Sequence, residues 1–407
     1  MHFIIIGGGL SGLAAATTLM NNGHTFQVLE KDRQVGGRVK TSQIEGHLID
    51  HGFQVYLPTY MEGRRFFDYP SLQLQGFDPG ALVLYDKGYH DIIMDPLRRP
   101  FQSFNSLLSK VGSFSDKKRL ISLRKLAGKY RNNPEAIDTS MSTYDFLVNV
   151  GFKQEMIHNF FIPFFSGVFF DKKLETSSAM FLFLYGKFGS SLASVPKKGM
   201  GELAKQMYAA LPQENIHLGE EVISIAKKSV QVASGKNYIG DRIILTSPSP
   251  KFGKANTKEQ VWCSAQTIYF EASKAPHPKR LIGIVAQKNV IVNNIAIMSN
   301  VNKAYAPENK HQIAVSIFGS NFDKSIEAQI KKECSAWFGK ETEEWQLIKD
   351  IKIEKALPNQ KSVRFHFSEE DCKLGGNLYS AGDSMLHGSI DGALKSGRLT
   401  AEYAMRD

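Results

Sequence analysis

Four residues near the N-terminus have the types and spacing needed to bind a dinucleotide. Gly7, Gly9 and Gly12 follow the G-x-G-x-x-G pattern, and Glu30 follows about 18 residues after the last of them. The first glycine permits a tight turn, the second lets a pyrophosphate approach the backbone, and the third lets a helix pack closely on a strand. A glutamate at the next strand end can accept both adenosine ribose hydroxyls and would repel the 2′-phosphate of NADP. We therefore predict a site for the ADP half of a dinucleotide.

The elements that must position these residues are visible around them. Residues 2–6 form a continuous apolar run, which is typical of a buried parallel strand. Residues 11–22 predict a helix, and residues 25–31 predict a second strand that finishes in Glu30. Together they form one β-α-β unit, in which the free N–H groups at the helix start attract phosphates.

Three further motifs lie at opposite ends of the chain. They are GGRVKT at 36–41, IDHGFQVY at 49–56 and LYSAGDSMLHGSIDGALKSGR at 378–398. In this order, and with the glycine motif, they resemble the flavin-containing amine oxidase superfamily, which includes monoamine oxidases, protoporphyrinogen oxidases and phytoene desaturases. The resemblance covers residues 1–60 and 375–407, with a fainter similarity over 196–250. It implies an FAD-dependent oxidoreductase that holds FAD non-covalently.

The resemblance assigns roles to individual residues. Arg38 would pair with the FAD pyrophosphate, because a guanidinium binds phosphate through two hydrogen bonds. Asp383 would hydrogen-bond the ribitol or a nearby hydroxyl, and Val222 lies where the family has an adenine-contacting valine. The N–H groups from Ser389 to Ala393 would face the flavin N1–C2=O edge and stabilise its charge when reduced. The alternatives are a surface arginine, a helix or turn cap, and an ordinary strand valine.

The predicted cofactor contacts combine the nucleotide motif with these assignments. They are Gly7, Gly9, Leu10, Ser11, Gly12, Glu30, Lys31, Gly37, Arg38, Gly52, Phe53, Gln54, Val222, Gly382, Asp383, Ser389, Ile390 and Ala393. Two side chains are candidates for catalysis. Gln54 could hydrogen-bond a substrate or the flavin edge, and His387 could move a proton, although a lone histidine before a helix is more often a polar turn residue.

Departures from the amine oxidases narrow the expected chemistry. Monoamine-type members carry an aromatic residue in a G-aromatic-x-x-G-A turn, whereas here GSIDGA places Ser389 there. No counterpart was found for the lysine whose water reaches flavin N5. The resemblance therefore favours the desaturase and porphyrinogen oxidase branches, with hydride abstraction from a C–H bond of a large apolar substrate onto flavin N5. The alternatives are amine oxidation at CH–NH, a non-redox flavin-dependent isomerase, and a flavin or lipid carrier.

We predict an α/β fold, with a Rossmann-like FAD-binding domain of the glutathione-reductase type and an inserted α+β substrate domain. The change of character near residue 60, where helical periodicity and dense aromatics begin, marks the insertion. The helical pattern includes Phe104, Leu107, Leu108 and Val111. The predicted FAD-binding parts are 1–60, 196–250 and 371–407, and the predicted substrate parts are 61–195 and 251–370.

Two segments of the substrate domain have unusual composition. Residues 159–170 and 180–189 are rich in phenylalanine, and they could line an apolar tunnel or simply form core. Residues 98–131 carry ten Lys or Arg and one Asp within a chain of net charge +10. We expect this segment either to contact an anionic membrane face or to be a solvated helix face. No nucleic-acid-binding module is present, so nucleic acid is a poor fit.

The three cysteines argue for a reducing compartment. Cys263, Cys334 and Cys372 are scattered and form no C-x-x-C pair, so we expect neither a disulfide framework nor a metal site. No run of the roughly 18 to 20 apolar residues needed to span a bilayer occurs, and the apolar start of the chain predicts a core strand, not a signal peptide. The expected location is cytoplasmic, with possible peripheral contact at the inner face of a membrane.

Overall fold

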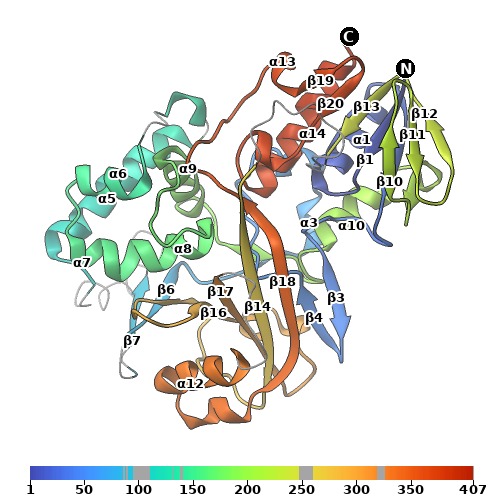
Figure 1. Cartoon of the computed structure of the whole chain (residues 1–407). Coiled ribbons are helices and arrows are strands. Elements are labelled where there is room, and N and C mark those ends of the chain that lie inside the picture. The colour runs from blue at the N-terminus through green and yellow to red at the C-terminus, as the bar shows by residue number, and fades with distance from the viewer. Residues whose placement is uncertain are drawn as a thin grey trace.

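The computed structural model describes residues 1–85, 88, 90–94, 111–131, 133–137, 141–246, 260–318 and 326–406. Two sheets organise these residues, and Figure 1 shows them meeting where the long strands β14 (Trp262–Ala272) and β18 (Gln346–Pro358) approach the N-terminal unit. Both chain ends lie beside each other on that unit (Figure 1).

The first sheet has six strands in the order β19-β20-β13-β1-β2-β9. Its strands are β1 (His2–Ile6), β2 (Thr25–Glu30), β9 (Ile216–Leu218), β13 (Arg242–Leu245), β19 (Lys373–Gly375) and β20 (Leu378–Ser380). Strand β1 pairs in parallel with β2 and β13, and only β19 pairs antiparallel. This arrangement confirms the predicted α/β class with a Rossmann-like unit.

Helices α1 (Leu10–Asn21) and α14 (Ile390–Ala404) pack on each other beside this sheet. The approach is close because glycines stand at the contacts. A Cβ added to Gly12 would lie 1.9 Å from the carbonyl oxygen of Gly7, and one added to Gly397 would lie 2.0 Å from that of Ser11. Residues Phe3, Ile4 and Ile5 of β1 are fully buried, as expected for a central parallel strand.

The second sheet has seven strands in the order β18-β14-β17-β16-β15-β6-β7. Its other strands are β6 (Gly80–Leu84), β7 (His90–Met94), β15 (Ile282–Val285), β16 (Val292–Ile297) and β17 (His311–Phe318). Only β6 and β15 pair in parallel. Helix α12 (Ile326–Phe338) packs on the sheet through Ile330, Cys334 and Trp337.

A group of helices lies at the left of Figure 1, away from the unit that carries both termini. It contains α5 (Phe114–Tyr130), α6 (Thr143–Asn149), α7 (Gln154–Met156), α8 (Ile162–Phe169) and α9 (Ser178–Phe188). The remaining helices are α2 (Gly63–Phe66), α3 (Tyr69–Leu72), α10 (Glu202–Ala209), α11 (Met298–Val301) and α13 (Glu369–Cys372). The remaining strands are β3 (Thr41–Ile44), β4 (His47–Asp50), β5 (Gln75–Gly76), β8 (Ser194–Val195), β10 (Val222–Ile225), β11 (Ser229–Val232) and β12 (Asn237–Ile239). The domain limits stay a prediction.

The phenylalanine-rich segments fold into a π-helical turn (Ile157–Phe161), α8 and α9. The rings of Phe161, Phe165 and Phe181 are buried and contact one another, with a centroid distance of 4.8 Å between Phe165 and Phe181. These rings therefore form core, which was the alternative to a tunnel lining. The helical pattern expected at Phe104, Leu107 and Leu108 lies outside the described residues.

Candidate cofactor and active site

The turn between β1 and α1 consists of Gly7, Gly8 and Gly9 and so presents backbone without side chains. Gly7 adopts a φ of +110°, which favours glycine, and Gly9 forms an isolated backbone bridge with Gly36. Gly37 lies close to Gly9, since a Cβ added to Gly37 would lie 3.4 Å from the Cα atom of Gly9. No side chain caps α1, because its N-cap is Gly9. Such a helix start, with its first-turn N–H groups uncapped by side chains, fits a pyrophosphate.

Glu30 is held at the end of β2 beside this turn. Its Oε2 accepts a hydrogen bond of 2.6 Å from the N–H of Gly8, and its Oε1 accepts one of 2.9 Å from the N–H of Asp32. Each carboxylate oxygen keeps a second lone pair for a ribose hydroxyl. Val222 begins β10 nearby, since the N–H of Glu220 donates to the carbonyl of Glu30 at 2.9 Å.

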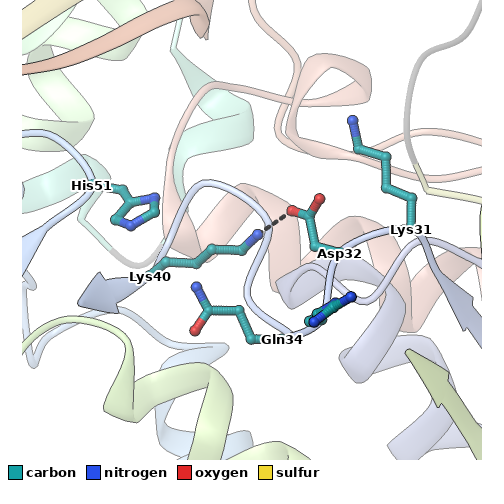
Figure 2. Close-up of a pocket in the computed structure, with 6 residues that line it drawn as sticks. Lys31, Asp32, Gln34, Lys40 and His51 are labelled. Carbon is teal, nitrogen blue, oxygen red and sulfur yellow. Dashed lines mark hydrogen bonds and ion pairs between the residues drawn. The ribbon is translucent and has the colours of Figure 1, made fainter. Parts of the chain in front are cut away.

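A cavity of about 530 Å³ lies over the loop that joins the predicted ribose and pyrophosphate contacts (Figure 2). It is lined by Lys31, Asp32, Arg33, Gln34, Lys40 and His51. Lys40 forms an ion pair with Asp32, and burial together with the charge of Lys40 lowers the pKa of His51. The lining therefore has more cationic than anionic groups, which suits the phosphates of a dinucleotide.

Arg38 and Asp383, which the sequence assigned separately to FAD, form one ion pair. The two guanidinium nitrogens donate to the two carboxylate oxygens at 2.9 and 2.6 Å, and Nη1 also donates to the carbonyl of Ala356 at 3.1 Å. The Asp383 side chain is 7% exposed, whereas that of Arg38 is 37% exposed. The arginine is thus oriented by the carboxylate while part of it stays accessible to a ligand.

The segment from Gly52 to Gln54 leaves a buried acceptor unused. The Gln54 Nε2 donates to the carbonyl of Arg38 at 2.9 Å, which ties two predicted cofactor contacts together. Among the described residues, the buried Gln54 Oε1 has no hydrogen-bond partner. Leaving such an atom unpaired costs about 1–3 kcal/mol. An N–H group of FAD or of a substrate would satisfy it, so these residues fit the cofactor.

His387 lies in an apolar enclosure just before α14. Its ring is 5.0 Å from that of Phe183 and 5.1 Å from that of Phe365. Burial lowers its pKa to about 3, so the ring is neutral at pH 7. Its Nδ1 lies 3.0 Å from the Ser389 hydroxyl, which caps α14 by accepting a 2.9 Å hydrogen bond from the N–H of Gly392. This setting favours the alternative of a polar turn residue over a proton carrier.

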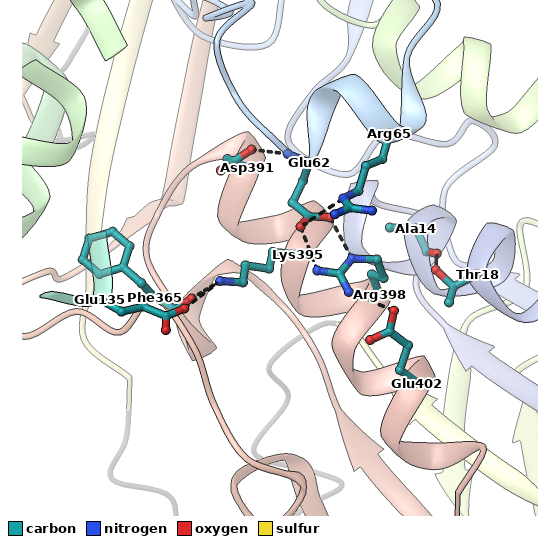
Figure 3. A network of polar contacts seen from close by, with 10 residues as sticks. All are labelled: Ala14, Thr18, Glu62, Arg65, Glu135, Phe365, Asp391, Lys395, Arg398 and Glu402. Atoms are coloured by element: carbon teal, nitrogen blue, oxygen red, sulfur yellow. Dashed lines mark hydrogen bonds and ion pairs between the residues drawn. The ribbon is translucent and has the colours of Figure 1, made fainter. Parts of the chain in front are cut away.

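Sequence reasoning missed a buried charged network behind the start of α14. Figure 3 shows Arg398 reaching Glu62 and Glu402, and Asp391 accepting from the backbone N–H of Glu62 at 2.9 Å. Lys187 is also buried, and its Nζ donates to the carbonyl of Thr59 at 3.0 Å. Long charged side chains are usually exposed, so only tertiary contacts reveal such a group.

The buried Asp391 predicts a pH dependence of stability. Burial raises its pKa to about 6, above the 3.8 of the free side chain, so the folded protein binds more protons than the unfolded chain between these values. The contribution of Asp391 to the free energy of unfolding should therefore fall as pH rises from about 4 to 6, by up to roughly 3 kcal/mol. Asp50, whose pKa burial also raises to about 6, adds to this fall, whereas His387, whose pKa burial lowers to about 3, opposes it. Urea titrations between pH 4.5 and 7.5 isolate Asp391, because the free energy of unfolding of the wild type minus that of Asp391→Asn should fall as pH rises. Glu308→Gln, at an exposed carboxylate, should match the wild type.

Comparisons with known proteins place the chain in a family. A family profile described as "Flavin containing amine oxidoreductase" matches residues 10–282. A diapophytoene desaturase of Staphylococcus haemolyticus is 36% identical over 80 residues, which is 18% of this chain and 16% of that enzyme. An L-amino-acid oxidase of Demansia vestigiata is 25% identical over 295 residues, or 67% of this chain and 53% of that enzyme.

The fold is similar to that of a solved putrescine oxidase variant, with a TM-score of 0.73 at 16% identity over 100% of this chain and 98% of that one. The chain thus spans well under two thirds of either curated relative, while the structural likeness extends over its whole length. Because the profile match takes in about two thirds of the sequence, the chain belongs to the flavin-containing amine oxidoreductase family.

Proposed function

We propose that the protein removes a hydride from a C–H bond of a large, mainly apolar substrate and passes it to N5 of FAD, while a neighbouring C–H bond loses a proton to solvent. The product carries a new double bond. The observation that carries this proposal is the turn before α14. Ser389 stands where amine-oxidising relatives have an aromatic residue, and its hydroxyl is occupied by capping the helix. The local likeness to a desaturase supports the same reading.

Bound FAD supplies the two-electron acceptor, and the protein's part is to hold and orient it. In this proposal the start of α1 holds the pyrophosphate together with Arg38, which Asp383 orients. The unpaired Gln54 Oε1 receives an N–H group near the flavin edge. Of the N–H groups predicted to face the reduced ring, those of Ser389, Gly392 and Ala393 already donate within the turn and helix start, so the N–H groups of Ile390 and Asp391 are the ones proposed to stabilise its negative charge. No catalytic base is assigned, because burial lowers the pKa of His387 to about 3 and so makes its ring a weak base.

The test is an absorption spectrum of the purified protein followed by anaerobic additions of an apolar polyene, a porphyrinogen and a primary amine. Bleaching of the flavin bands by the polyene or the porphyrinogen supports the proposal. Bleaching by the amine alone would overturn the proposal in favour of amine oxidation at CH–NH. The match to an L-amino-acid oxidase over 295 residues supports that alternative. Isomerised polyene without bleaching replaces it with a non-redox isomerase, and bound flavin with no turnover replaces it with a carrier.

We also propose that one face of α5 contacts an anionic membrane surface, from the cytoplasmic side, where apolar substrates dissolve. Along this helix Phe114, Lys118, Ile121, Lys125 and Lys129 recur at helical spacing and are exposed, Phe114 by 79% and Ile121 by 44%. Each basic side chain near such a surface contributes about 1 kcal/mol. No helix in the described part of the chain is long and apolar enough to cross a membrane. The basic residues expected at 98–110 lie outside the described residues.

Charge reversal on this face should abolish membrane binding. Lys118→Glu, Lys125→Glu and Lys129→Glu together are expected to end co-sedimentation with liposomes rich in phosphatidylserine at low salt. Lys227→Glu with Lys228→Glu, at exposed positions on the first sheet's side, is the control and should bind as the wild type does. Wild-type protein that stays in the supernatant would rule out the contact.

A further inference from the structure

A row of polar side chains crosses one face of the second sheet. Thr267 on β14, Ser316 on β17 and Asn294 on β16 lie in register, Thr267 opposite Ser316 and Ser316 opposite Asn294. All three are more than nine-tenths buried, and the next row on the same face is apolar apart from one tyrosine hydroxyl. Buried polar groups in a sheet need partners, so this polar row needs a physical explanation.

A β-bulge adds a fourth side chain to the polar row. The pairing of β16 with β17 passes from Val292 directly to Asn294, which leaves Asn293 as the extra residue. Bulges re-aim side chains and occur often beside active sites. Asn293 and Asn294 both reach helix α8, where a Cβ added to Gly167 would lie 2.5 Å from each amide nitrogen. The hydroxyl of Ser166 donates to Asn293 Oδ1 at 3.0 Å, so this amide is paired.

The other end of the polar row reaches the segment predicted to contact the flavin. Thr267 Oγ1 accepts a hydrogen bond of 3.1 Å from the N–H of Phe53. Gly52 packs against the same face of the second sheet, since a Cβ added to Gly52 would lie 2.9 Å from the Ile353 side chain. The polar row thus leads from the Gly52–Gln54 segment toward α8.

One acceptor in the polar row is unused. Asn294 is 8% exposed, and its Oδ1 is buried without a hydrogen-bond partner in the part of the chain that the structure describes. The neighbouring side chains of the polar row are neutral amides and hydroxyls. Because an ammonium group buried among them would lack a counter-charge, a neutral donor fits this acceptor better than a cation.

We propose that the polar row binds a hydroxyl group of the substrate, which donates to Asn294 Oδ1 and thereby orients the adjacent carbon chain toward the flavin. This inference rests on the proposed function and narrows its substrate class to mainly apolar molecules that carry an alcohol. Thr267 and Ser316, whose hydroxyl oxygens lie 3.5 Å apart, complete the polar surface on the flavin side.

The test compares two isomeric probes on the FAD-loaded protein. 1-Dodecanol and methyl undecyl ether have the same atoms, but only the alcohol donates a hydrogen bond. Dissociation constants come from the change in flavin absorption, without turnover. We expect the alcohol to bind about tenfold more tightly than the ether. Dodecylamine should bind less tightly than the alcohol at pH 7. Equal affinities of alcohol and ether, or preference for the amine, would overturn the inference.

Variants separate this role from simple packing. Asn294→Leu should erase the preference for the alcohol while leaving the ether affinity, the FAD content and the melting temperature nearly unchanged. Asn302→Leu is the matched control. That buried amide is already paired with the carbonyl of Lys197 and the N–H of Ala304, so the variant should melt lower yet keep the preference. If Asn294→Leu does not fold, Asn294→Ala, which also lacks an acceptor, replaces it. An unchanged preference in the folded Asn294 variant would overturn the inference.

The two proposals fail in different ways. Because the assay measures binding, a selective response to the alcohol in a protein whose flavin no substrate reduces would overturn only the hydride-transfer proposal. Flavin that is reduced by apolar polyenes while alcohol and ether bind equally would overturn only the role of the polar row.

Discussion

Gly12→Ala is expected to leave the protein without bound FAD and with a much lower melting temperature. The new Cβ would lie 1.9 Å from the carbonyl oxygen of Gly7 and 3.3 Å from the hydroxyl of Thr246. Both neighbours are fixed, since Thr246 Oγ1 itself donates to the Gly7 carbonyl at 3.1 Å. Helix α1 would have to move away from β1, and the close approach of Gly9 to Gly37 would be lost. We expect a loss of about 3 kcal/mol in the free energy of unfolding.

The measurements are the ratio of flavin to protein absorbance after purification and a thermal denaturation curve. Gly128→Ala in α5 is the matched control, because a Cβ added at this ordinary helical position meets no atom within 4 Å. That variant should retain FAD and gain up to about 1 kcal/mol, since alanine favours helix over glycine. A Gly12→Ala protein with a full complement of flavin would contradict the assignment of this turn to the cofactor.

The fold class could be predicted from the sequence because its signals are local. The glycine spacing, the apolar run of β1 and the acid at the end of β2 all fall within thirty residues, and each reports on its own neighbours. The start of α14 was also predictable, since Ser389 has the residue type and position of an N-cap.

Features that depend on contacts between distant segments could not be predicted. Nothing in the sequence shows that Arg38 and Asp383, 345 residues apart, form a pair. The one signal in the sequence is that two residues of opposite charge lie in motifs that are assigned to the same ligand. The bulge at Asn293 is hidden too, because an irregular pairing depends on the partner strand and leaves the composition of β16 unchanged.

The phenylalanine-rich segments were ambiguous for a related reason. A continuous apolar run has the same sequence pattern whether it fills a core or lines an apolar cavity, because both environments exclude water. Only the contacts among Phe161, Phe165 and Phe181 decide for core. The polar row, by contrast, was overlooked because single Asn, Ser and Thr residues within apolar strands give no periodic signal.

Arg38→Met is expected to raise the dissociation constant of FAD by about a hundredfold. The guanidinium makes two hydrogen bonds to Asp383 and leaves part of its surface accessible to the pyrophosphate. Each hydrogen bond to a charged group contributes about 1.5–3 kcal/mol, and the substitution also strands a carboxylate that is 7% exposed. Arg38→Lys should recover only part of the affinity, because an ammonium group cannot bind both oxygens in the same plane.

A double-mutant cycle then decides how the pair acts. If Asp383 serves mainly to orient Arg38, Asp383→Asn should weaken FAD binding by about tenfold, and the double variant should bind no worse than Arg38→Met alone. Additive losses would mean that each residue contacts FAD independently. Arg364→Met, which breaks an exposed pair with Asp371, should change the stability by less than about 1 kcal/mol and leave FAD affinity as it was. Apoprotein titrated with FAD and followed by quenching of flavin fluorescence gives the dissociation constants of the wild type and of the five variants. If Arg38→Met binds FAD with full affinity, the ion pair between Arg38 and Asp383 does not contribute to FAD binding. Its role would then be structural, to join the loop after β2 to the turn before α14.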